Sequence, residues 1–462
     1  MKPKYFLALG LLVLGLGSCG ESFFEQYPSN NITEGNFYKT DDDFNQGVVA
    51  CYAKLKTQMS FHLTEIGYRG DENVLESMAV STQNRYDIDH FAETANNGIL
   101  NDIWNAWYNG IYRCNDVLDH MTGAKIANYD KYRGECLFLR SWWYFNLYRV
   151  FGVVPITRTV VTPAAAKLIP RCTEEEMYTL LTEDLAEAAR LLPPTPGPEK
   201  ARVANIAAYT LLAKAYLTFG KPAEAKTALE EAMKNTSYGL ESTTKKVFDV
   251  GNKMNREIIF ALYYNKTNDN GHGYWYSANT DVLADINNPT PTFKAIYDSE
   301  KDNRLPLISS YTKIKDNLFA MTKWYDTYDA TYTTQVGNDF PHLRYADVVL
   351  MYAEALAESG GSLGDALEWL NKTRTRAGLD ELTTDEVKSL AEFRRELAAE
   401  RGREFALEGH RWFDLVRLGL AVDYFREMGY SLDSHNLIFP IPQNQIEIVN
   451  NPSILWQNPG FN

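Results

Sequence analysis

The chain has 462 residues, of which 45% are hydrophobic and 23% are charged. This is enough apolar material for a large core, so a disordered chain and a small disulfide-rich domain are both excluded. The 46 basic residues are outnumbered by 60 acidic ones, which gives a net charge of −14. Because an acidic chain has no long-range attraction for phosphates, we expect no nucleic acid partner. The 29 Tyr, 22 Phe and 9 Trp residues suffice for a core and for aromatic surfaces that stack on flat ligands.

Residues 1–18 predict a lipoprotein signal peptide. Two lysines near the start precede an apolar stretch of 12 residues, from Tyr5 to Leu16. This stretch is too short to span a hydrocarbon layer of about 30 Å, so it is typical of a signal segment. The sequence LGSC that ends at Cys19 is similar to a bacterial lipobox. We therefore expect cleavage before Cys19 and lipidation of this residue, which would tether the protein to a membrane. The alternative is a simple signal cleavage site with a chance cysteine.

The other four cysteines give no redox or zinc motif. They are Cys51, Cys114, Cys136 and Cys172. None forms a C-x-x-C pair, so a zinc ribbon and a thioredoxin-like site are not supported. Four cysteines allow three disulfide pairings, and the sequence does not choose among them. We favour buried free thiols for Cys114 and Cys136, because both lie in apolar helical surroundings.

Amphipathic helices dominate the periodic signal. Apolar residues recur every three or four positions over 101–121, and an aromatic segment over 132–151 ends at Gly152. A capping box begins at Thr173 and predicts a helix to residue 192. A second capping box at Thr383 predicts a charged helix that continues to residue 417, with a break near a glycine at 402 or 409. The only clear strand signal lies at 258–263.

The helices contain a repeat signal. Around Tyr216, the pair Leu212-Ala213 and the later Ala225 and Leu229 have the spacing of a tetratricopeptide unit. Looser copies lie at 351–370 and 139–189. Small residues at these positions let paired helices approach closely. The fold class expected is therefore all-α, with tetratricopeptide-like helix pairs as a scaffold; generic amphipathic hairpins are the alternative.

Two segments between the helices are expected to be long, irregular capping loops. They lie near 61–98 and 264–340, and their tyrosine, asparagine and glycine content is high. Loops of this length are uncommon in compact domains unless they have a function. We therefore expect the ligand to bind there, on a single body that spans residues 19–462.

Searches for catalytic motifs find none. The sequence has no phosphate-binding loop, no H-E-x-x-H and no nucleophile elbow. A partial calcium-loop pattern at 266–271 has lysine in place of the first acidic ligand. We expect no enzymatic activity, no metal and no other cofactor, although a glycosidase with two acids far apart in sequence stays open. The charged run at 392–404 is interpreted as a solvated or ion-paired helix face.

Several strings, taken together, are similar to those of one family. They are Leu139-Arg140 with Phe151-Gly152 and Pro155, Ala201-Arg202 with Ala207-Ala208-Tyr209, the run 344–356, Asn371 with 374–378, the run 401–415, Ile441-Pro442 and 458–461. These strings resemble the SusD/RagB family of outer-membrane nutrient-binding lipoproteins over nearly the whole mature chain. One departure is that Gly402 and Ala406 stand where the family often has charged or bulky residues.

The resemblance implies an all-α tetratricopeptide-like fold and a SusC-like TonB-dependent outer-membrane barrel as partner. It implies a non-catalytic surface lipoprotein of the outer membrane that captures oligosaccharides and faces the cell exterior. The matching strings are structural and carry no catalytic residue. A peptide- or glycoprotein-binding lipoprotein of the same fold is the alternative, and a pure protein-interaction scaffold is a third possibility.

The ligand site is predicted from the chemistry of sugars. A sugar ring needs an aromatic platform with polar side chains around its edge. The candidates are Tyr68, Arg69, Asp71, Asn73, Tyr274, Trp275, Tyr276 and Trp324, with Tyr86 and Tyr325 as secondary choices. The alternative is that these aromatics only hold their own loops on the scaffold. Five other tryptophans are assigned to the core: Trp104, Trp107, Trp142, Trp143 and Trp412.

Overall fold

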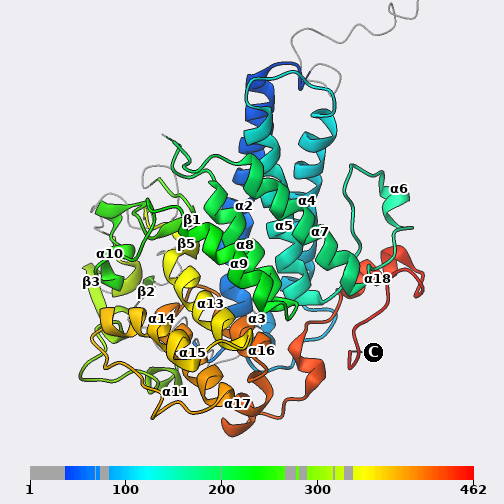
Figure 1. Cartoon of the computed structure of the whole chain (residues 1–462). Helices are drawn as coiled ribbons and strands as arrows, with labels where there is room; N and C mark the ends of the chain where they lie inside the picture. Colours follow the sequence, from blue (N-terminus) through cyan, green and yellow to red (C-terminus); the bar gives the residue numbers. More distant parts are fainter. Residues whose placement is uncertain are drawn as a thin grey trace, which may run out of the picture.

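The computed structural model describes residues 37–67, 69–72, 83–197, 199–265, 277–279, 289–315, 318–326 and 337–461. The predicted signal peptide and the predicted lipidation site Cys19 lie outside these residues. The described part is mainly helical (Figure 1), as expected. Among its helices, none combines the length and apolarity needed to cross a membrane.

Successive helix pairs form the scaffold. The long helices are α2 Asp41–Gly67, α4 Gly98–His120, α5 Tyr129–Phe151, α7 Glu174–Leu191, α8 Asn205–Thr218, α9 Pro222–Met233, α13 Tyr345–Glu358, α14 Leu363–Arg376 and α15 Leu390–Glu404. Each packs on the next through α4, α5, α7, α8 and α9, and α9 then packs on α13, which pairs with α14. The three predicted repeat copies correspond to the pairs α8–α9, α13–α14 and α5–α7. The all-α, tetratricopeptide-like class is confirmed.

Shorter helices and two small sheets complete the described part of the fold. The helical ones are α3 Gln83–Asp89, α6 Pro163–Ala166, α10 Thr244–Val247, η2 Val250–Asn252, α11 Pro291–Lys294, α12 Leu305–Ser309, η4 Thr322–Trp324, α16 Arg411–Arg417, α17 Ala421–Glu427, η5 Ser434–Leu437 and α18 Gln443–Val449. Strand β1 (Ile258–Leu262) falls where the sequence predicted one and pairs antiparallel with β5 (Phe340–Arg344). The other sheet has the order β2-β4-β3, formed by Ser277–Asn279, Leu318–Met321 and Tyr311–Lys315.

The predicted loop at 61–98 is helical in two places. Helix α2 continues through residue 67, and α3 occupies 83–89. Asn97, at the end of this segment, caps α4 by accepting a hydrogen bond from the Ile99 amide at 3.1 Å. The expectation of one irregular loop over 61–98 is therefore wrong at least for residues 61–67 and 83–89.

The two predicted capping boxes have different outcomes. Thr173 caps α7 as expected, with both reciprocal hydrogen bonds to Glu176. Thr383 also bonds Glu386, but these residues close a turn, and the next helix begins only at Leu390, capped by Ser389. That helix ends at residue 404, and the chain turns before α16 at Gly409, which has a φ of +75°. The prediction of one long helix from 383 was thus wrong at its start and right about the break.

The core contains the aromatic residues assigned to it. All five tryptophans are buried, and so are the four cysteines, which are free thiols. Gly110 on α4 lies against Trp143 on α5, where an added Cβ would be 2.2 Å from an indole carbon. The glycine is therefore needed for the close approach of these two helices.

Candidate functional site

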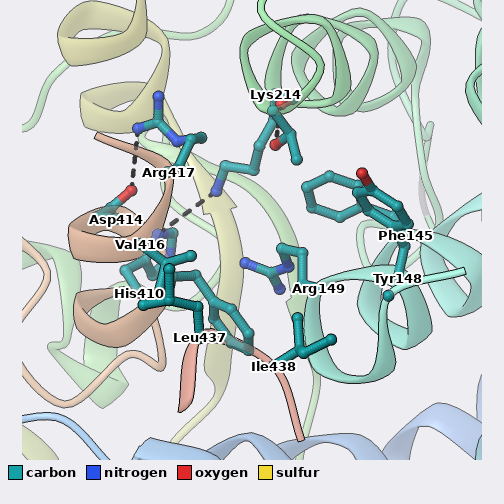
Figure 2. Close-up of a pocket in the computed structure, with 13 residues that line it drawn as sticks. Phe145, Tyr148, Arg149, Lys214, His410, Asp414, Val416, Arg417, Leu437 and Ile438 are labelled. Atoms are coloured by element: carbon teal, nitrogen blue, oxygen red, sulfur yellow. Dashed lines mark hydrogen bonds and ion pairs between the residues drawn. The ribbon is translucent and has the colours of Figure 1, made fainter. Parts of the chain in front are cut away.

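A cavity of about 300 Å³ opens between α5, α8 and the segment that holds α16. Figure 2 shows its lining, with the Arg149 guanidinium in the middle of the group. The lining residues are Phe145, Tyr148, Arg149, Gly152, Lys214, Thr218, His410, Phe413, Asp414, Val416, Arg417, Leu437 and Ile438. This cavity was not predicted from the sequence, because its lining residues come from four segments that are far apart in the chain.

Two of the predicted ligand residues are buried ion-pair partners. Arg69 is fully buried, pairs with Glu93 and donates through Nη1 to the Asn436 carbonyl at 2.7 Å. Asp71 is 2% exposed and accepts from Arg411 Nε at 2.9 Å. Their polar atoms face the interior, so the expectation that they form the rim of a sugar site is not met.

Trp324 is also buried. It lies in η4, is 1% exposed, and packs edge-on against Phe248 with ring centroids 5.1 Å apart. Phe340 of β5 lies against it as well, at 6.2 Å. A ligand cannot stack on this indole. The residue instead belongs to the core that packs against β5.

The remaining candidates lie outside the described residues. They are Tyr68, Asn73, Tyr274, Trp275 and Tyr276. The described flanks of their two segments do meet: Thr290 Oγ1 donates to the carbonyl of Asp71 at 2.9 Å. At the other flank, Tyr264 is 5% exposed and its hydroxyl donates to the Lys56 carbonyl of α2 at 3.3 Å. The segments that carry the candidates thus begin or end beside each other on the scaffold.

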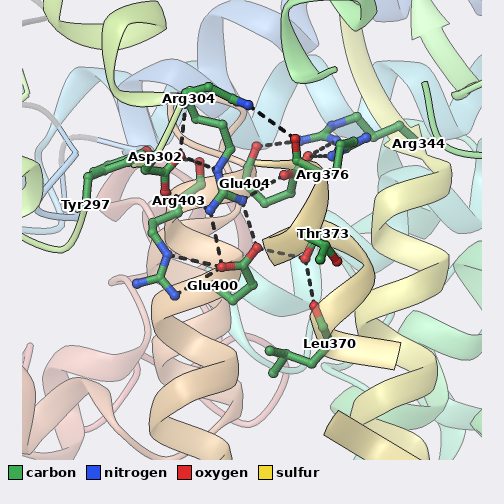
Figure 3. A network of polar contacts seen from close by, with 12 residues as sticks. Tyr297, Asp302, Arg304, Arg344, Leu370, Thr373, Arg376, Glu400, Arg403 and Glu404 are labelled. Carbon is green, nitrogen blue, oxygen red and sulfur yellow. Dashed lines mark hydrogen bonds and ion pairs between the residues drawn. The ribbon is translucent and has the colours of Figure 1, made fainter. Parts of the chain in front are cut away.

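A network of buried charges involves residues of α15 together with Arg304 and Arg344 (Figure 3). Arg304 forms ion pairs with Asp302, Glu400 and Glu404, at 2.7 to 3.0 Å. The second centre is Arg344, which lies 2.8 Å from a carboxylate oxygen of Glu257. The charged run on α15 is therefore ion-paired, as one of the two interpretations had it, but its residues 400–404 are buried rather than solvated.

The electrostatics of the network follow from this pairing. Glu404 also contacts Arg344 and Arg376, and these guanidinium groups hold the pKa of its carboxyl far below the usual range despite burial. Burial raises the pKa of Glu257, although Arg376 and Arg344 oppose the shift. Such a cluster of ion pairs organises the fold. Among the described residues, no group of three or more His, Cys, Asp or Glu side chains is arranged to bind a metal ion.

The comparisons with known proteins agree with this architecture. The profile described as "SusD family" matches residues 302–461, and the one described as "Starch-binding associating with outer membrane" matches residues 27–217. SusD-like protein P2 of Formosa agariphila is 25% identical, over 99% of this chain and 100% of that protein.

Solved structures give the same result for the fold. A SusD-like protein from Bacteroides fragilis has a TM-score of 0.79 at 22% identity, over 94% of this chain and 100% of its own. Surface glycan-binding protein A from Bacteroides thetaiotaomicron, in complex with laminarihexaose, has a TM-score of 0.74 at 22% identity, over 91% and 99%.

Successive helix pairs of this type, joined by a buried ionic network, define a tetratricopeptide-like scaffold protein. More narrowly, the chain belongs to the SusD/RagB family. The resemblance seen in the sequence strings is thereby confirmed.

Proposed function

We propose that this chain is a non-catalytic, cell-surface lipoprotein that captures oligosaccharides and delivers them to a SusC-like TonB-dependent barrel. The observation that carries the proposal is the match of nearly the whole chain to SusD-like proteins, one of which was solved with laminarihexaose bound. The lipobox at Cys19 supports attachment to the outer membrane, with the body facing the cell exterior.

The proposed binding site is carried by the two long segments near 61–98 and 264–340. Tyr274, Trp275 and Tyr276 would be the aromatic platform, and Tyr68 and Asn73 would contribute from the other segment. The hydrogen bond between Thr290 and Asp71 supports this pairing, because it brings the flanks of both segments to one place. Arg69, Asp71 and Trp324 are buried, and in this proposal they would hold the described parts of these segments on the scaffold.

We expect the mature chain, residues 20–462, to be retarded in native gels that contain a recognised polysaccharide, with laminarin among those tested. Trp275→Ala should abolish the retardation, because stacking on the indole supplies much of the binding energy for a sugar ring. Trp369→Ala, which changes a partly buried indole on α14 of the scaffold, is the matched control and should bind like the wild type. Retardation by no glycan would contradict the proposal and favour the peptide-binding alternative.

We expect Cys19→Ala to release the protein from the membrane fraction. The thiol that carries the acyl chain is lost, and buried acyl carbons supply about 0.8 kcal/mol per methylene to the anchor. Fractionation of cells followed by immunoblotting measures the change. The wild-type lipoprotein, solubilised in mild detergent, should co-purify with a TonB-dependent barrel. A Cys19→Ala protein that stays with the membrane and is released only by high salt would show that the anchor is not this lipid.

A further inference from the structure

The cavity of Figure 2 is lined by the cations Arg149, Lys214 and Arg417 and the anion Asp414, and further charged groups lie behind this lining. On the inner side of the cavity, the charged groups that line it or lie directly behind it are the cations Arg149, Lys214, Arg401 and Arg417 and the anions Asp347, Glu354 and Asp414. The carboxylate of Glu174, which contacts the Tyr148 hydroxyl, is exposed and screened by water, so it is left out of this balance. The ion pairs are Asp347–Lys214, Asp347–Arg401, Asp414–Arg401, Asp414–Arg417 and Glu354–Arg417. The three carboxylates thus balance three of the four cations. The cation left over is Arg149.

His410 does not add to this excess. Burial, assisted by the nearby Lys214, lowers the pKa of its imidazole well below the ordinary value, so the ring is neutral. Its Nδ1 lies 3.4 Å from Lys214 Nζ, where a neutral ring nitrogen accepts a hydrogen bond from an ammonium group. The balance of charge around the cavity is therefore one positive charge at neutral pH.

Arg149 is held in place without a carboxylate. Its guanidinium lies over the rings of Phe413 and Phe145, at 3.9 and 4.7 Å from their centroids. One nitrogen, Nη2, donates to the amide oxygen of Asn146. The buried Nε atom has no hydrogen-bond partner within the described parts of the chain. Burial lowers the pKa of Arg149 to about 9, yet leaves the group charged at neutral pH.

Arg149 is partly buried, and it forms no ion pair of its own among the described residues, although Asp414 and Asp347 are near enough to raise its pKa. A largely desolvated cation without a direct carboxylate partner is costly, and proteins normally pair such groups. The side chain is nevertheless fixed between two aromatic rings, beside open space of about 300 Å³. This volume is at the lower end of the range for pockets that hold small molecules. A preformed cation next to a cavity of that size is the arrangement that a small anion needs.

We propose that this cavity binds a small monocarboxylate, such as a sugar acid, with its carboxylate on the guanidinium of Arg149. The planar guanidinium fork matches a carboxylate, and one unpaired positive charge matches one negative charge. A phosphate group carries about −1.5 to −2 at pH 7 and would leave the cavity with an excess of negative charge.

The rest of the cavity suits the body of such a ligand. Apolar contact is available from Phe413, Leu437 and Ile438, and the hydroxyls of Tyr148 and Thr218 lie in the lining. Both hydroxyl hydrogens are already donated, to Glu174 and to the Lys214 carbonyl, so these oxygens are acceptors for ligand hydroxyls. The site is built by helices and not by the two long segments, so it goes beyond the proposed function and does not depend on it.

Isothermal titration of residues 20–462 with sodium D-glucuronate tests the proposal, with D-glucose as the neutral probe at the same sodium concentration. We expect saturable binding of glucuronate and none of glucose. Arg149→Gln should weaken glucuronate binding by about tenfold or more, because a hydrogen-bonded charge pair is lost. The matched control Arg395→Gln removes an exposed arginine on α15 and should bind like the wild type.

Two further variants keep the test decisive if Arg149→Gln does not fold. Arg149→Lys retains the charge but not the fork, and should bind more weakly than the wild type. Val416→Phe fills the cavity from its wall and should abolish binding while Arg149 remains. The proposal is overturned if the wild type does not bind glucuronate, if these variants bind it unchanged, or if inorganic phosphate binds more tightly than glucuronate.

Discussion

Replacement of Arg344 by methionine should lower the free energy of unfolding by about 3–5 kcal/mol, the range for breaking a buried ion pair on one side. Arg344 is 1% exposed and pairs with Glu257, Glu404 and Glu408. Methionine has a similar length but no charge, so three carboxylates lose a shared cation inside the protein. Urea-induced unfolding of the mature chain at pH 7 measures the difference.

The contrasting variant is Lys301→Ala. Lys301 also forms an ion pair, with Asp380, but the two side chains are 50% and 81% exposed. Water screens this pair, so its removal should change the unfolding midpoint little or not at all. If Arg344→Met were as stable as Lys301→Ala, the buried network would contribute nothing to stability, and its role would need a different explanation.

The sequence was a good guide to features that depend on local pattern. The helix around Trp107 and the capping of α7 at Thr173 follow from side-chain spacing within one or two turns. Local pattern failed at Thr383, where the same capping signal closes a turn, because Ser389 offers a second cap just before the helix. Competing local signals of this kind are resolved only by how the segment packs.

Features that depend on distant partners were not predictable from sequence. Arg69 and Asp71 stand in a polar segment and looked like the rim of a binding site. Their partners are Glu93 and Arg411, and nothing in the local sequence indicates the pairing with a residue 340 positions away. Likewise, the charge spacing of α15 is that of a surface helix. One side of it is nevertheless buried, because Arg344 pairs with Glu404 and Arg304 pairs with Glu400.

The excess charge at Arg149 illustrates the same limit for a candidate site. In sequence, Arg149 is one of several polar residues near the end of an aromatic helix. Its significance depends on which carboxylates reach it, and the nearest ones are engaged by Lys214, Arg401 and Arg417. The net charge around a cavity can be counted only once the fold is known. The family strings, by contrast, can be recognised from the order of residues alone.

Glu72→Gln should stabilise the protein by an amount that grows as the pH rises. Glu72 is 1% exposed, and burial raises the pKa of its carboxyl from 4.5 to about 8; Asp71 adds to the shift, whereas Arg411 and Lys323 oppose it. A carboxyl with a raised pKa in the folded state contributes stability that is fully present below pH 4.5. This contribution is lost as the pH rises from 4.5 toward 8, because the carboxyl ionises in the unfolded chain while the buried group stays protonated. Glutamine does not titrate and keeps an Oε1 atom that accepts from the Leu407 amide.

The two proteins should therefore have similar unfolding free energies at pH 5 and differ by a few kcal/mol at pH 9, on the order of 1.4 kcal/mol for each unit of the shift. Urea unfolding of both chains at pH 5, 7 and 9 measures this widening. Glu381→Gln, which removes an exposed carboxyl, controls for the loss of one surface charge. A constant difference between wild type and Glu72→Gln across this range would mean that Glu72 is already ionised at pH 5. Its charge would then be balanced by Arg411 and Lys323, and the turn at 69–72 would be a further part of the buried ionic network.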